Sequence, residues 1–134
     1  MSWRQSLVRI SEFQVEELRK RLAAVTDRRV EAEMKLVLLH AEAEAESRRS
    51  AQDVEAGWYR VGYLEGWRAR RDATLLAIET IKIEEAGARD AVAEAFAELK
   101  KYEQLEENAQ LADRRAEAKR ETAELDQLGL RRAS

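Results

Sequence analysis

The chain has 134 residues, five glycines, no cysteine and no proline, and 38% of its residues are charged. The lack of cysteine excludes disulfides and thiolate metal sites, and the lack of proline permits long helices, because an interior proline costs a helix about 3 kcal/mol. The net charge is −3 with both signs interspersed, so a nucleic-acid-binding tail is excluded.

The first helix is predicted from about residue 3 to residue 56. Ser2 and Gln5 have the spacing of a capping box at its start. Trp3, Leu7 and Ile10 follow at steps of four and three. Their register is shifted from the one that comes after, which we interpret as a stutter.

A coiled-coil seam follows in the same helix. Residues at alternating steps of three and four are apolar over four heptads, and only Arg29 breaks the series. The apolar members are Val15, Leu18, Leu22, Val25, Ala32, Leu36, Leu39 and Ala43. Much of the chain's apolar content is alanine, which favours helix but buries little surface, so a two-helix arrangement is favoured over a compact globule.

The chain reversal is predicted at about residues 57–60, where glycines first become frequent. Gly57, Gly62 and Gly66 fall close together. A turn at Gly66 would leave the two helix ends flush, whereas a turn at Gly57 leaves the end of the second helix overhanging. A second apolar series begins soon after Gly57, which favours the earlier turn.

The second helix is predicted from about residue 60 to residue 128, with a C-terminal stop at Gly129. Its series runs Leu64, Trp67, Arg71, Thr74, Ile78, Ile81, Glu85, Ala88, Val92, Ala95, Leu99 and Tyr102, then weakens to Leu105, Ala109, Ala112 and Ala116. The predicted fold is therefore all-α. It is a single domain over residues 1–134, in which two long helices form an antiparallel coiled-coil hairpin with an overhanging C-terminal helix end.

No catalytic, cofactor or metal site is predicted. His40 is the one histidine and lies at the seam, where a structural role is favoured because no second metal ligand or general-base partner accompanies it. The glycines lack the Lys-Ser/Thr ending of a phosphate-binding loop. The carboxylate pairs at residues 84–85 and 106–107 are interpreted as ordinary exposed helix side chains. The sequence thus predicts a protein that is not an enzyme, and the lack of a long apolar run predicts a cytoplasmic location.

Two places depart from the repetitive pattern. Trp58, Tyr59, Tyr63 and Trp67 cluster beside the predicted turn, where they either pack against one another or form an exposed surface for a partner. The end of the second helix, from about Leu111, keeps leucines without a predicted partner helix, as expected of a segment that docks onto another protein.

Charge distinguishes the two ends of the predicted hairpin. Residues 1–30 and residues 113–134 have more basic than acidic side chains, whereas residues 79–107 are strongly acidic. An antiparallel hairpin brings the two basic segments together, where they suit a negatively charged partner. The alternative is that each charge only solvates an exposed helix face.

Three segments resemble the FliJ family of flagellar type III export proteins. They are Ser6–Ile10 at the start, the alanine-rich stretch Ala91–Glu103, and Arg120–Asp126 near the end, after which Gln127 stands where the family often has Glu. The resemblance covers nearly the full length, and the order of these segments strengthens it.

This resemblance implies a cytoplasmic antiparallel coiled coil that acts as a stalk. Its terminal end would enter and activate a hexameric export ATPase, and it would contact the export-gate membrane protein and escort export chaperones. Contact with the membrane would come only through these partners. The family's gate contact matches Tyr63 and Trp67, with Trp58 and Tyr59 beside them, whereas Arg70 and Thr74 fit the family pattern poorly. Residues assigned to the ATPase contact are Arg4, Arg9, Leu111, Arg114, Arg115, Lys119 and Arg120.

Two other hypotheses remain open from the sequence. The chain could be a structural scaffold that dimerises through its seam and has no ATPase partner. The amphipathic segment Trp3–Ile10 could instead associate with a membrane surface, although it is short for that role.

Overall fold

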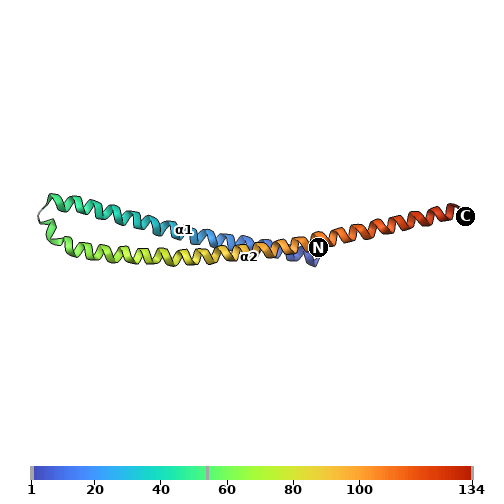
Figure 1. Ribbon diagram of the computed structural model, residues 1–134, viewed down its shortest axis with the longest axis horizontal. Coiled ribbons are helices and arrows are strands. Elements are labelled where there is room, and N and C mark those ends of the chain that lie inside the picture. The colour runs from blue at the N-terminus through green and yellow to red at the C-terminus, as the bar shows by residue number, and fades with distance from the viewer. Residues whose placement is uncertain (1, 54, 134) are drawn as a thin grey trace. The chain divides into compact units, whose positions relative to one another are not determined.

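The computed structural model describes residues 2–53 and 55–133, and it contains two helices, α1 (Trp3–Gln52) and α2 (Ala56–Ala133) (Figure 1). No strand occurs among these residues, which confirms the all-α prediction. The chain divides into two compact units. One comprises Glu17–Val92, and the other comprises Met1–Glu16 with Ala93–Ser134.

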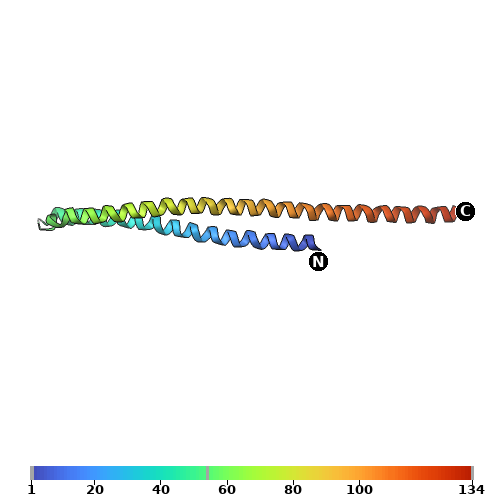
Figure 2. The ribbon, with the colours of Figure 1, turned by 90° about the horizontal axis from the view of Figure 1, so that it is seen from below.

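In the unit Glu17–Val92, α1 and α2 lie side by side and run antiparallel, as both views show (Figures 1 and 2). The predicted seam is confirmed here, because the residues at its positions are buried or half-buried while most of those between them are exposed. Most of its buried members are large apolar side chains, with two polar exceptions. The buried residues are Val25, Leu39, Trp67, Thr74, Ile78, Ile81 and Glu85.

The turn lies earlier than predicted, because α1 ends at Gln52 and α2 begins at Ala56. The Asp53 carboxylate accepts a hydrogen bond from the Glu55 N–H at 3.0 Å, and the Glu55 carbonyl accepts one from the Trp58 N–H at 3.2 Å. An aspartate that hydrogen-bonds the backbone two residues on can make a turn without glycine. The prediction of a turn at residues 57–60 was therefore wrong: Gly57 lies inside α2, and no described glycine has a positive φ.

In the other unit, the first part of α1 packs against α2 beyond Ala93. Val15, Leu99 and Ser11 are buried there, whereas Trp3 and Ile10 are more than half exposed. The predicted stutter was wrong. The small Ser11 occupies the seam position four residues before Val15, so the heptad spacing continues without interruption and turns Ile10 outward.

The start of α1 has the predicted capping box. The Ser2 N–H donates to the Gln5 side-chain oxygen at 3.1 Å, and the Gln5 N–H donates to the Ser2 hydroxyl at 3.2 Å. These bonds satisfy backbone donors that a helix start leaves without a partner inside the helix.

The C-terminal part of α2 is unpaired within its unit. Every described residue from Leu111 onward is exposed, and α2 continues past the N-terminus with no helix beside it (Figure 2). The predicted overhang is confirmed, but the predicted stop at Gly129 was wrong, because α2 continues to Ala133. A single glycine costs a helix only about 1 kcal/mol, and good helix formers flank this one.

Candidate functional site

Two exposed aromatic side chains stand in the first turn of α2. Trp58 and Tyr59 are 86% and 79% exposed, and with Glu55 they line a shallow pocket beside the turn. They fall outside the heptad series of α2, and their exposure shows that α1 does not cover them. Large aromatic side chains held in solvent by a helix are suited to burial against a partner.

Trp67 differs, because it belongs to the seam. It is 8% exposed, and its indole Nε1–H donates a hydrogen bond of 2.7 Å to the Leu39 carbonyl of α1. The His40 ring lies edge-on to it at 5.5 Å between centroids, and the Arg71 guanidinium lies 5.4 Å from its ring. The expectation that Trp67 forms part of an exposed surface is therefore corrected: its indole joins the two helices.

Tyr63 lies between these extremes and is half-buried. Its hydroxyl is buried near the Glu42 carboxylate, and burial first, then the charge of Glu42, raises its pKa. Glu42 is held by Arg70, whose guanidinium donates to both carboxylate oxygens at 3.1 and 3.3 Å. Thr74 is buried and donates to the Arg70 carbonyl. Arg70 and Thr74 thus have structural contacts, and the exposed aromatic surface reduces to Trp58 and Tyr59 with Tyr63 at its edge.

The basic residues near the N-terminus have two different environments. Arg4 Nε donates to Glu106 at 3.1 Å, and both side chains are largely covered, so Arg4 is part of the pairing between α1 and α2. Arg9 is exposed, on the wall of a shallow groove that Glu106 and Gln110 also line. Of the two, Arg9 is the one available to a partner.

The other residues assigned to an ATPase contact lie on the unpaired part of α2, Leu111–Ala133, which we call the tail. Arg114, Arg115, Lys119 and Arg120 are all exposed there, and Leu111 is 39% exposed. The tail also presents leucines to solvent, namely Leu125, Leu128 and Leu130. One face has a shallow groove between alanines and charged side chains. This helix therefore offers both apolar and cationic groups to a binding partner.

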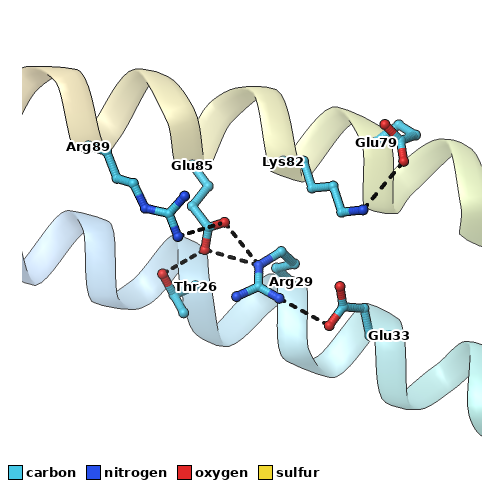
Figure 3. Close-up of polar contacts among 7 residues, drawn as sticks. All are labelled: Thr26, Arg29, Glu33, Glu79, Lys82, Glu85 and Arg89. Carbon is cyan, nitrogen blue, oxygen red and sulfur yellow. Dashed lines mark hydrogen bonds and ion pairs between the residues drawn. The ribbon is translucent and has the colours of Figure 1, made fainter.

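The seam contains a charged cluster that the sequence analysis did not recognise as one unit (Figure 3). The Glu85 carboxylate is buried and accepts hydrogen bonds from Thr26 Oγ1 at 2.8 Å and Arg29 Nε at 2.9 Å. Arg89 lies 3.4 Å from the same carboxylate, and Arg29 also binds Glu33 at 3.0 Å. The bonds from Thr26 and then Arg29 lower the Glu85 pKa. The sequence signal was the presence of two opposite charges, Arg29 and Glu85, at seam positions of opposite helices.

The prediction that the carboxylates at residues 84–85 and 106–107 are all exposed was wrong for two of them. Glu85 is buried and Glu106 is half-buried, because each occupies a seam position and meets an arginine of α1. Their neighbours Glu84 and Glu107 are exposed as expected. Each of these two carboxylates forms an ion pair between α1 and α2, so its role is structural.

Among the described residues, no group of three His, Cys, Asp or Glu side chains is placed to hold a metal ion. In the same part of the chain, neither helix has a stretch long and apolar enough to cross a membrane. The candidate functional surfaces are therefore two: the tail, and the exposed Trp58 and Tyr59 with Tyr63 beside them, which we call the turn aromatics.

Comparison with known proteins decides the family. Over 132 residues the chain is 50% identical to the flagellar FliJ protein of Caulobacter vibrioides strain NA1000 / CB15N, covering 98% of this chain and 95% of that protein. The FliJ protein of strain ATCC 19089 / CIP 103742 / CB 15 matches equally. The chain belongs to the FliJ family. No protein-family model and no solved structure matches it.

FliJ membership confirms the resemblance predicted from three short segments of low complexity. The alignment covers nearly the whole chain, so the match does not rest on those three segments alone. The roles that the resemblance assigns to individual residues stay predictions.

Proposed function

We propose that this FliJ family member is a non-enzymatic, cytoplasmic component of flagellar type III protein export, and that its tail binds and activates the hexameric export ATPase. The observation that carries this proposal is the tail itself. A long helix with exposed leucines and no partner helix exposes apolar surface that binding to another protein would bury. Its arginines and lysine would complement acidic walls of a pore.

The same proposal assigns the turn aromatics to the export gate. Trp58 and Tyr59 lie in the first turn of α2 with most of their side-chain surface in solvent, which supports a surface that a partner would cover. Trp67 supports this surface indirectly, because it fixes α2 against α1. Escort of export chaperones rests on the family resemblance alone.

The ATPase contact is tested by changing the tail and measuring stimulation of ATP hydrolysis by the purified hexameric export ATPase. Substituting Arg114, Arg115, Lys119 and Arg120 together with alanine should reduce stimulation strongly without altering the thermal unfolding of the hairpin, because none of these side chains packs against α1. The matched control substitutes four exposed basic residues of the other unit, Lys20, Arg21, Arg48 and Arg68. Equal loss in both variants would indicate a nonspecific charge effect and reject the tail as the contact.

The gate contact is tested separately. Trp58→Ala with Tyr59→Ala should weaken binding to the purified cytoplasmic domain of the export gate but leave ATPase stimulation unchanged. Phe13→Ala is the control, since Phe13 is another exposed aromatic, in the other unit. Unchanged gate binding in the double variant would reject this surface.

A scaffold that self-associates is the second candidate, and one observation favours it. Val30, Met34, Val37 and Leu38 lie close together in the sequence of α1 and are each more than half exposed. Light scattering distinguishes the two functions, because a scaffold should dimerise as its concentration rises and the proposed stalk should stay monomeric.

A further inference from the structure

The register between the two helices is constant in the unit Glu17–Val92. Arg28 Nη1 lies 3.0 Å from Glu84, and Glu42 lies 3.1 Å from Arg70. Moving two heptads forward along α1 thus moves two heptads back along α2. A coiled coil of this kind has competing alignments, because sliding one helix by a heptad returns every seam position to the seam.

One competing alignment is favoured by the glycines. In this alignment, each α1 residue would face the α2 residue seven positions after the one that it faces in the structure. The turn would then move half a heptad toward the C-terminus. It would then lie at about residues 57–60, between Gly57 and Gly62, where the sequence analysis predicted it. Glycine at a turn has low conformational strain, so the local sequence gives this shifted hairpin a suitable loop.

Most of the seam would also accept the shift. By the heptad register, Val25 would face Val92 in place of Glu85, and Leu39 would face Ile78 in place of Arg71. Arg71 would in turn come opposite Glu46, which is a favourable pairing. In the other unit, Arg4 would exchange Glu106 for Asp113, so an ion pair could form again there, although Glu106 would come opposite Ser11 and lose its arginine.

The shift would break every bond that Arg29 and Glu85 make across the seam, and each would keep only its partner on its own helix, Glu33 and Arg89 respectively. Arg29 would come opposite Ala88, and Glu85 would come opposite Ala32. Glu85 is 4% exposed, and taking the hydrogen bonds of Thr26 and Arg29 away from a buried carboxylate is strongly destabilising even where the ion pair itself adds little stability. Trp67 would also move and lose its hydrogen bond to the Leu39 carbonyl.

We propose that the Arg29–Glu85 ion pair, with the hydrogen bond from Thr26, is a register lock that selects the hairpin turning between Gln52 and Ala56 over the hairpin shifted by one heptad. A single buried polar pair can fix the alignment of a coiled coil at a cost in stability. The lock has a consequence for the surface, because the shifted turn would include Trp58 and Tyr59. It therefore keeps the turn aromatics on the helix.

Cross-linking can measure the register directly, because the chain contains no cysteine. Cysteines at Glu42 and Arg70, which face each other, report the observed register. Cysteines at Glu42 and Ala77 report the shifted one. The two registers differ by about 10 Å along the helix axis, so a short thiol cross-linker distinguishes them when only intramolecular products in dilute solution are counted.

In the natural background, the first reporter should cross-link and the second should not. In the Arg29→Leu/Glu85→Leu background, we expect cross-linking of the shifted reporter to rise about tenfold or more, with the helix content retained. The matched control is Arg28→Leu/Glu84→Leu, which removes the adjacent exposed Arg–Glu ion pair and should leave the shifted reporter unlinked. The exchanged pair Arg29→Glu/Glu85→Arg should restore the observed register.

Three outcomes would overturn the proposal. If the shifted reporter stays unlinked in the double-leucine background, then the turn or Trp67 sets the register. If it rises equally in the exposed-pair control, the effect is not specific to the seam. If the double-leucine variant loses its helix content, the pair is needed for folding itself and has no separate role in register.

Discussion

Replacing Trp67 with alanine should destabilise the hairpin more than any other single aromatic substitution in the chain. Trp67 is 8% exposed, so nearly all of its side-chain surface is removed from water on folding. An indole buries roughly 150–250 Å², which at about 25 cal/mol per Å² corresponds to about 4–6 kcal/mol. Alanine retains part of this burial, and the neighbours in a two-helix seam can relax into the space. The expected loss in free energy of unfolding is therefore about 3–4 kcal/mol.

Trp58→Ala is the matched control, because it removes the same side chain from a site that is 86% exposed. It should change stability by less than about 0.5 kcal/mol. For a chain of this length, 1 kcal/mol corresponds to a shift of about 3–4 °C in the unfolding midpoint, so Trp67→Ala should lower the midpoint by about 9–16 °C. Thermal unfolding followed by far-UV circular dichroism measures both variants.

Trp67→Phe separates packing from hydrogen bonding. It keeps an aromatic ring in the seam but removes the N–H that donates to the Leu39 carbonyl, and should cost about 1–2 kcal/mol. Equal midpoints for Trp67→Ala and Trp58→Ala would refute the placement of Trp67 in the seam. Trp67 would then count among the exposed turn aromatics.

Further predictions concern acid stability, the glycines and the turn. Because the Glu85 pKa is lowered from its ordinary value of 4.5, the ionised carboxylate stabilises the fold above that pH. This stabilisation should be lost as pH falls through the lowered folded-state pKa, so the midpoint of the natural chain should fall more steeply in acid than that of Glu85→Gln. Gly66→Ala and Gly87→Ala should each stabilise the chain by about 0.5–1 kcal/mol, because both glycines lie in α2 with open space where a Cβ would stand; lower midpoints in thermal melts would contradict a helical backbone there. Asp53→Ala should cost about 1 kcal/mol in a denaturant titration, through loss of its bond to the Glu55 N–H, whereas Asp53→Asn should cost much less.

The seam could be predicted from sequence because it depends on a property repeated many times. From Val15 to Ala43 and from Leu64 to Tyr102, every position in the predicted series is buried or half-buried. Each step of three or four adds the same information about which face is covered, so one polar member such as Arg29 does not obscure the pattern. The same redundancy made family membership recognisable from short segments of low complexity.

The turn could not be placed in the same way, because it depends on a few local interactions. Gly57 indicated a loop, but α2 accepts it at a cost of about 1 kcal/mol, which the seam as a whole outweighs. The observed turn instead uses the carboxylate of Asp53, and nothing in the sequence makes that residue stand out from the chain's many other acidic side chains. The difference between the two placements is about half a heptad, so it corresponds to one full heptad of relative sliding.

Which of the aromatic side chains near the turn are exposed depends on the heptad register of α2 and cannot be deduced from residue type. Trp58, Tyr59, Tyr63 and Trp67 form one cluster when only residue type is considered. When the heptad spacing of α2 is extended back from Trp67, the preceding seam positions are Leu64 and Arg60, and both are half-buried. Trp58 and Tyr59 lie before the first of these positions, so they remain in solvent, while Trp67 is covered by α1. A shift in register would redistribute these environments, which is why a charged pair about seven helical turns away in the seam bears on the exposed surface at the turn.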